Sequence, residues 1–546
     1  MNRIFTAALV AAITLQAQTA RVGVGVVEHK LTLSDAVVMA LKNNLEVSIE
    51  KTNTSDAEQA VRLAKGAFDP TFRWQPSVEN RNTPSSSSLQ GVNGKLAERF
   101  FVQNFAFHQA TPWMGASFDA SFNNNRTSSN NAFSSLNPYI TSQLNFTFTM
   151  PLLRNRATDR QRSEILIRNK QVGVTETGFE LKVIDVVARV EQAYWDLVGA
   201  RQDATVEGDA VELATKQLEQ NQRMIDSGAL APVELSASQA ELERRRDTYL
   251  ASVGTLTEAE NNLKTLLLPH RQDEMWGEAI LPVDTRISEE PRNPDDLREA
   301  VAAALKQRPE LRQLALETEA NGIEENFRAD QTKPQVNLVA GYTNAGLAGS
   351  LQPSTSNPFS SSLGQIYQRL NVLSAAAALP PVVPASFGSL PNTIVGGYGT
   401  TLASVFGGKF PSVQAGVQFD LTFRNRAAQA GYSQSLIAGK RLKYQMDLAE
   451  QTIEAQVRNA LQAIQTARQR IAAAEASERA ANEKLASETR LFKTGESTNF
   501  LVLTRQNEYL DSRRRVVVAH LDYNKAVARL EQAAGDTLSA HHVKLP

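Results

Sequence analysis

The sequence contains no cysteine among its 546 residues. Disulfide bonds and thiolate metal sites are therefore excluded as parts of the fold. The sequence also lacks an excess of charge of either sign, because 57 Lys and Arg stand against 58 Asp and Glu, for a formal net charge of -1. A broad nucleic-acid surface needs an excess of basic residues to neutralise phosphates, so we expect no nucleic-acid partner.

Histidine is scarce as well, with six residues that show no metal-ligand spacing. His541 and His542 lie in a polar C-terminal tail, residues 536–546, where we expect solvated side chains. The sequence contains no G-x-S-x-G, H-E-x-x-H or G-x-x-x-x-G-K-[ST] motif. These absences predict a protein without catalytic residues, without a metal and without a cofactor.

Long hydrophobic runs are missing too. The first residues, MNRIFTAALVAAITLQAQTA, predict a secretory signal over residues 1–17, with Arg3 as the basic start and Ala17 as a plausible cleavage position. The apolar run from Ile4 to Leu15 is too short to cross a bilayer, and no later stretch has the unbroken apolar length of a transmembrane helix. Any membrane-spanning part is therefore expected to consist of β-strands.

The sequence does contain an internal duplication. LSDAVVMALKNNLE (Leu33–Glu46) matches LREAVAAALKQRPE (Leu297–Glu310), and LLRNRA (Leu152–Ala157) matches TFRNRA (Thr422–Ala427). Further landmarks follow in the same order. We interpret residues 31–268 and 295–535 as two structural repeats, joined by a linker at 269–294.

Each repeat shows the pattern of a helix, strands, and two long helices joined by a turn. The long helices are expected within 157–268 and 427–535, and the first of each pair extends on the order of 100 Å at about 1.5 Å per residue. Apolar residues recur at every seventh position: Val183, Val190, Leu197, Ala204, Val211, Leu218 and Ile225. This period predicts a left-handed supercoil. Taken alone, it also fits an ordinary coiled coil.

Segments of strictly alternating polarity lie within 68–152 and 334–423, the second interrupted by a predicted long loop at 346–408. Such strands fit either a half-buried soluble sheet or a lipid-facing barrel with a wet lumen. Polar loops between them favour the barrel, whose lipid-facing side would include Phe146, Phe148, Val417 and Phe419. One chain has too few strands to enclose a wide lumen, so we expect several chains to close it.

These residues resemble the TolC-type outer-membrane efflux protein family over essentially the whole mature chain. The resemblance rests on LTLSDAVVMALKNNLEV, on GAFDPTF before the first strand, on RNRA after the strands, and on two R-x-x-x-x-G turns. It implies an α+β membrane protein: a homotrimer with an outer-membrane β-barrel that continues into a long periplasmic α-helical barrel. It also implies docking to a periplasmic adaptor and an inner-membrane transporter, in a tripartite efflux or type I secretion system.

The resemblance further implies four strands per chain. The segment FFVQNFAFHQ (Phe100–Gln109) adds strand-like material to the first repeat, so four or more strands remain open. Two alternatives remain. A periplasmic adaptor or structural coiled-coil protein would explain the helices but not the strands. An outer-membrane hydrolase would need a serine and an acid near His108, the one histidine placed on a predicted strand.

The turns between the long helices carry the expected contact sites. We expect Gly228 and Gly495 to end the descending helices in a left-handed conformation. By resemblance, an adaptor packs against Gly228-Ala229-Leu230 and Gly495-Glu496-Ser497. Family members often carry acidic residues beyond the second tip glycine. Here Leu501 and Thr504 take those places, with Glu234 in the first repeat, which predicts a more apolar periplasmic gate.

Overall fold

The computed structural model describes residues 21–24, 27–86, 90–91, 93–228, 231–284, 297–352, 358–383 and 390–543. The predicted signal at 1–17 and the tip residues Ala229 and Leu230 lie outside them. The chain divides into two compact units. The helical unit comprises 1–58, 170–319 and 440–546, and the sheet unit comprises 59–169 and 320–439.

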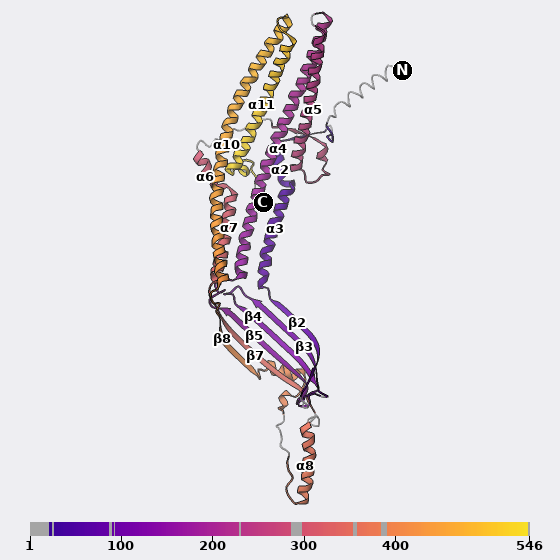
Figure 1. Cartoon of the computed structure of the whole chain (residues 1–546), viewed down its shortest axis with the longest axis vertical. Coiled ribbons are helices and arrows are strands. Elements are labelled where there is room, and N and C mark those ends of the chain that lie inside the picture. Colours follow the sequence, from indigo (N-terminus) through magenta and orange to yellow (C-terminus); the bar gives the residue numbers. More distant parts are fainter. Residues whose placement is uncertain are drawn as a thin grey trace, which may run out of the picture. The chain divides into compact units, whose positions relative to one another are not determined.

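Two long helical hairpins dominate the chain (Figure 1). The first consists of α4 (Arg160–Asp226) and α5 (Val233–Leu267), and the second of α10 (Arg426–Thr494) and α11 (Asn499–Ala534). Shorter elements complete the helical set: α2 (Leu33–Asn43), α3 (Leu45–Lys65), α6 (Leu297–Gln307), α7 (Pro309–Gln331) and α12 (Thr537–Ala540). None of the described helices combines the length and apolar composition that a bilayer crossing requires.

The helical unit has two hydrophobic cores built from corresponding positions of the two repeats. The first core includes Ala36, Ala40, Val190, Leu197 and Leu263. The second includes their counterparts, in the same order: Ala300, Ala304, Val457, Ile464 and Leu530. Alanine on α2 and α6 allows the helix backbones to approach closely, while the heptad positions of α4 and α10 fill the space between them. A parallel pair of short strands, β1 (Glu28–Leu31) and β6 (Ala279–Pro282), borders the first core.

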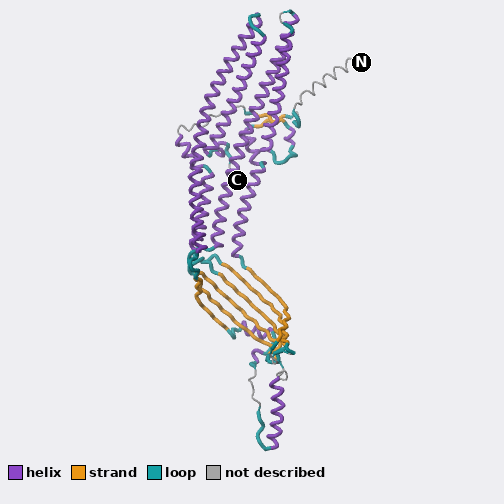
Figure 2. Tube along the Cα trace, in the orientation of Figure 1, coloured by secondary structure: helices purple, strands orange, loops and turns teal. Residues whose placement is uncertain are grey.

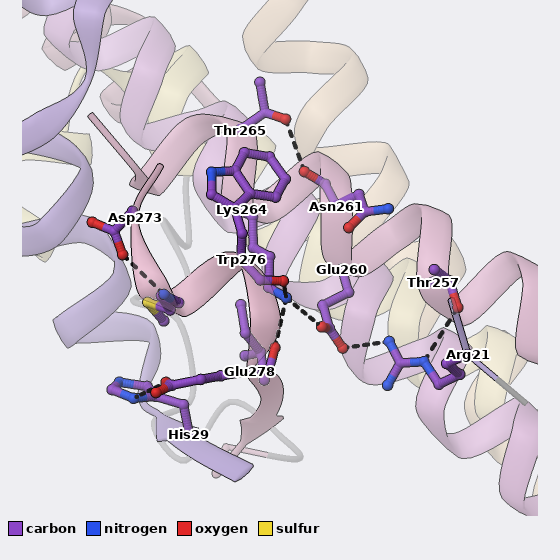
Figure 3. A network of polar contacts seen from close by, with 12 residues as sticks. Arg21, His29, Thr257, Glu260, Asn261, Lys264, Thr265, Asp273, Trp276 and Glu278 are labelled. Carbon is purple, nitrogen blue, oxygen red and sulfur yellow. Dashed lines mark hydrogen bonds and ion pairs between the residues drawn. The ribbon is translucent and has the colours of Figure 1, made fainter. Parts of the chain in front are cut away.

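Charged residues are buried beside this first core, where α5 ends (Figure 3). Lys264 and Glu260 form an ion pair with both side chains fully buried, 2.8 Å apart. Arg21 reaches Glu260 at 2.5 Å and Thr257 at 3.2 Å. Lys264 also donates to the carbonyl oxygens of Trp276 (3.0 Å) and Glu278 (2.6 Å). The segment after α5 is thus held to the helix by a buried ion pair and by hydrogen bonds from Lys264 as well as by apolar contact.

The sheet unit contains one antiparallel six-stranded sheet in the order β2-β3-β4-β5-β7-β8 (Figure 1). Its strands are β2 (Thr71–Pro84), β3 (Lys95–Ala110), β4 (Ser117–Ser129), β5 (Leu136–Pro151), β7 (Gln335–Leu351) and β8 (Pro411–Asp420). The segment Phe100–Gln109 lies within β3. Among the described residues, the first repeat therefore contributes four strands to this sheet and the second two, which exceeds the four per chain implied by the resemblance.

The description of residues 346–408 as a long loop is wrong. β7 continues to Leu351, and two helices follow, α8 (Pro358–Ala376) and α9 (Tyr398–Phe406) (Figure 2). The glycines and prolines around both helices produced the loop-like composition that hid them.

Candidate functional site

Both helical hairpins turn at a glycine in the left-handed region. Gly228 has φ +76° and Gly495 has φ +83°, and a Cβ at either position would meet open space. The conformation, rather than a close neighbour, therefore explains glycine at these tips. The amide of Glu496 bonds back to the carbonyl of Leu491 at 2.9 Å, which closes the end of α10. Thr498 begins α11, with its hydroxyl accepting from the Leu501 amide.

A buried polar network connects the two hairpins just beyond these turns. Asn499, at the start of α11, is 2% exposed. Its side-chain oxygen accepts from Asn221 at 2.9 Å and Gln217 at 3.3 Å, both on α4. Its side-chain nitrogen donates to Glu234 at 3.1 Å and Ser238 at 3.4 Å, both on α5. Asn499, in the second repeat, therefore forms hydrogen bonds with side chains on both long helices of the first repeat.

Of the predicted gate residues, Glu234 belongs to this network, whereas Leu501 and Thr504 lie on the first turns of α11. Glu234 contacts Asn499. Leu501 is exposed, and Thr504 is half-buried with its hydroxyl bonded to the carbonyl of Phe500 at 2.8 Å. Asn499 was not among the sequence-based candidates, because asparagine at the start of a helix is ordinarily a capping residue. Its burial, which only the tertiary structure shows, distinguishes it.

Ion pairs continue the connection along α11. Three of its cations face three α4 carboxylates: Arg514 pairs with Asp203 at 2.7 Å, Arg513 with Asp209 at 3.1 Å, and Lys525 with Asp196. Between them, Glu207 is 2% exposed, and burial raises the pKa of its carboxyl against the opposing effect of Arg514 and Arg245. The second hairpin is thus bound to the first by complementary charge as well as by hydrogen bonds.

Strand register shows that Phe146, Phe148, Val417 and Phe419 share one face of the sheet. Phe146 lies opposite Ala120 and Tyr342, and Val417 lies opposite Leu338. Directly opposed residues share a face, so the whole set can be assigned. The apolar face carries Phe72, Trp74, Val78, Phe105, Phe107, Phe118, Phe122, Leu144, Phe146, Phe148, Leu338, Tyr342, Val413, Val417 and Phe419.

The opposite face is mainly polar, with residues such as Arg73, Gln75, Asn104, Asp119, Gln143 and Gln418. On the apolar face, Phe146 is 48% exposed and Phe419 65%. This sheet therefore exposes a continuous aromatic surface in the isolated chain, of a size that marks a membrane or protein contact.

The hydrolase alternative depends on His108, which lies on the polar face. Its Nδ1 is 2.6 Å from the Asp119 carboxylate, and both side chains are half exposed. The described residues supply an acid to this histidine but no hydrogen-bonded serine. The pair lies on an exposed sheet surface rather than in a pocket, so the geometry gives no support to a nucleophilic site.

The expectation that His541 is solvated is wrong. Its side chain is 14% exposed and contacts Glu191 of α4, with Glu531 of α11 at 3.8 Å. Burial, and then the charge of Glu191, raise the pKa of Glu531 to about 7. Burial opposes the charged form of His541, but its hydrogen bond to Glu191 and the charges of both carboxylates outweigh this and raise its pKa. His541 thus belongs to a largely buried charge cluster with Glu191 and Glu531, which the local composition of the C-terminal tail could not reveal.

An amphipathic sheet and two long helical hairpins in one duplicated chain are the parts of an α+β outer-membrane channel protein. The family model described as "Outer membrane efflux protein" matches residues 112–267 and 300–536. The chain belongs to this family, whose members are channels and not enzymes, so the resemblance and the expected lack of catalysis are both confirmed.

Several solved structures share this fold. The chain is similar to the CmeC outer membrane channel of Campylobacter jejuni, at 14% identity and a TM-score of 0.62, covering 92% of this chain and 86% of that one. It is also similar to VceC of Vibrio cholerae, at 12% identity and 0.61, covering 92% and 96%. The open-state MtrE channel of Neisseria gonorrhoeae matches at 14% and 0.56, covering 93% and 89%. No curated protein sequence matches the chain significantly.

Proposed function

We propose that the protein is a homotrimeric exit duct of the outer membrane, serving a tripartite efflux or type I secretion system. The observation that carries this proposal is the open six-stranded sheet with one aromatic face. Its edge strands β2 and β8 have exposed residues along almost their whole length. Lipid tolerates no unpaired strand edge, so a membrane-embedded sheet of this kind must close through other copies.

Three copies would close a barrel of eighteen strands, because each contributes six to one sheet. Barrels of about this size leave an aqueous channel, whose wall here would be the polar face. In this arrangement Phe146, Phe148, Val417 and Phe419 contact lipid, and the helical hairpins of the three copies form a periplasmic conduit. Substrates would enter from an inner-membrane transporter through a periplasmic adaptor that docks at Gly228, Ala229, Leu230, Gly495, Glu496 and Ser497.

The absence of cysteine makes the closure directly testable. Cysteine pairs placed on β2 and β8, for example Gln75→Cys scanned against Ser412→Cys, Gln414→Cys and Gln418→Cys, should yield a covalent trimer under oxidising conditions. A cysteine in β3 combined with one in β7 provides the control, because both edges of each of these strands are already paired within the chain. A soluble monomer that never cross-links and is absent from the outer-membrane fraction would overturn the proposal.

The proposed resting gate consists of Leu501 and Thr504, with Glu234 held nearby by Asn499. An apolar constriction blocks ions by dewetting, so Leu501→Ser should raise single-channel conductance in planar bilayers without changing trimer assembly. Val518→Ser removes an exposed apolar residue from the same helix and serves as the matched control. Unchanged conductance in Leu501→Ser, Thr504→Ala and the double variant would place the constriction elsewhere.

A further inference from the structure

The polarity of α9 is inverted relative to an ordinary helix on a protein surface. Thr401 and Ser404 are fully buried against the sheet unit, together with Val405. Tyr398 (41%) and Phe406 (70%) are exposed, and Leu402 and Ala403 lie on the same side. A surface helix in water shows its polar side chains outward and its apolar ones inward. The reverse pattern indicates that the surroundings of α9 are apolar.

The buried hydroxyls of α9 are satisfied within the helix. Thr401 donates to the carbonyl of Gly397, and Ser404 donates to the carbonyl of Thr400 at 3.0 Å. They therefore need no water on the sheet side. The exposed side offers no hydrogen-bonding group except the phenol of Tyr398. Moreover, no charged residue occurs between Arg369 and Lys409, a segment that includes the whole of α9.

Side-chain contacts place α9 on the aromatic face of the sheet. The Asn344 side chain donates to the carbonyl of Val405, and the Phe406 ring lies 6.0 Å from that of Phe122. Asn344 and Phe122 share the parity of Tyr342, Leu144 and Phe146. At Gly346, on the same face, a Cβ would lie 2.5 Å from the Thr401 carbonyl, so only glycine allows the helix so close.

The helix covers the part of this face where polar residues interrupt the exposed apolar run. On β5 Ser142 follows Leu144, and Ile140 beyond it is 5% exposed; on β7 Asn344 follows Tyr342, and Ala348 beyond it is fully buried. Ser142 and Asn344 are each 1% exposed, and α9 packs against both strands. The polar continuation of the aromatic face is thus removed from the surface.

The dimensions agree with this role. Seven residues of strand, tilted by about 45°, span only about 15 Å along the membrane normal, whereas an outer-membrane barrel has an apolar band about 25 Å tall. A helix lying across the strands adds a width of about 10 Å. The apolar side of α9 therefore supplies the missing part of the band over β4, β5 and β7.

We propose that α9 is a lipid-contacting helix, which seals polar strand ends and presents Tyr398, Leu402 and Phe406 to the acyl chains of the membrane. This rests on the proposed function, because it requires the aromatic face to point into lipid. It adds that α9, within the second-repeat insertion between β7 and β8, is part of the membrane surface.

Single-cysteine variants carrying a nitroxide label test the proposal in the full-length protein, reconstituted in dioleoylphosphatidylcholine vesicles. Leu402→Cys and Phe406→Cys are the test sites. Phe146→Cys is the lipid reference, Gln143→Cys the reference on the polar sheet face, and Lys409→Cys an exposed site just after α9. We expect labels at 402 and 406 to behave like the label at 146. They should be accessible to oxygen, and several-fold less accessible to a water-soluble nickel chelate than the label at 409.

The alternatives give different results. Access of the nickel chelate at 402 and 406 equal to that at 409, with 146 still protected, would overturn the role of α9 and leave the exit duct intact. Exclusion of both reagents at 402 and 406 would mean that protein, such as another copy, covers the helix, and would also overturn it. If 146 itself were open to the nickel chelate, the lipid-facing sheet and the proposed function would fail together.

Discussion

At the residue scale, the buried charges of the helical unit are the positions where single substitutions should have the largest effects. Lys264 neutralises Glu260 and satisfies two carbonyl oxygens, all without access to solvent. Lys264→Met keeps the volume but leaves Glu260 with Arg21 as its remaining cation. Loss of a buried partner costs about 3–5 kcal/mol when the remaining charge is uncompensated, and the Arg21–Glu260 pair reduces this cost. Thermal unfolding of the detergent-solubilised protein, followed by circular dichroism at 222 nm, should show the loss.

Lys216→Met is the matched control, because the Lys216–Glu212 pair is about two-thirds exposed and belongs to the same hairpin. Exposed pairs contribute little to stability, because water screens the two charges. Similar unfolding temperatures for the two variants would show that the buried network at the end of α5 does not stabilise the fold.

The cluster at the docked tail predicts a pH dependence. The folded pKa of Glu531, about 7, lies above its ordinary 4.5, so the folded state retains a proton that the unfolded carboxyl has lost between these values. His541 also has a raised pKa, and Glu191 and Asp536 add negative charge around both groups. Both contributions are fully present below their unfolded pKa values and are lost as pH rises through the folded ones.

Glu531→Gln should therefore match the wild type at pH 4 to 5 and exceed its stability at pH 8 by about 1–3 kcal/mol. Unfolding temperatures measured at pH 5, 6.5 and 8 test this, with Glu212→Gln as an exposed control. Parallel profiles of unfolding temperature against pH for wild type and Glu531→Gln would show that this cluster does not contribute to the pH dependence of stability.

At the element scale, the predictable parts were those governed by local sequence. The heptad positions and the two tip glycines indicated the hairpins, because helix periodicity and left-handed turns depend on nearby residues. Alternation likewise placed Phe146 and Val417 on one sheet face. α9 was missed because its polar side faces the sheet, so its sequence does not show the usual pattern of a surface helix. The partners of Asn499 on α4 and α5, and Glu191 opposite His541, lie hundreds of residues away, so local sequence does not predict these contacts.

Asn499 links three helices, so its replacement should loosen both tips together. Asn499→Leu removes one acceptor from the buried amides of Asn221 and Gln217, which keep Ser238 and Asn221 as their other acceptors; an N–H left unpaired costs up to about 1–3 kcal/mol. We expect faster hydrogen exchange in peptides covering the tip ends of α4 and α5, and a higher open probability in planar bilayers. Glu496→Gln, at the exposed tip turn, should leave both unchanged. Unaltered exchange in Asn499→Leu would show that the hairpins are held by other contacts.

At the scale of the whole molecule, the duplication is conserved in the helices and broken in the sheet. The cores of the helical unit use the same positions in both repeats, whereas the first repeat contributes four strands and the second only two. The second repeat instead carries α8 and α9 between its strands. The proposed trimeric barrel therefore depends on one aromatic face to which the first repeat contributes four strands and the second two.

The proposed assembly requires the aromatic face to point into lipid and the polar face into the lumen. Two substitutions on β5 test which face is which. Phe146, near the middle of the apolar run, lies on the aromatic face, and Gln143, exposed and three residues away, lies on the polar face. Arginine at a lipid-facing midplane site costs about 2–4 kcal/mol in each chain, whereas arginine in a wet lumen costs little. Phe146→Arg should therefore reduce the yield of heat-resistant trimer in the outer-membrane fraction, while Gln143→Arg should assemble normally and shift ion selectivity toward anions. Normal assembly of Phe146→Arg together with failure of Gln143→Arg would reverse the assignment of the two faces, and equal tolerance of both would place the sheet outside the membrane.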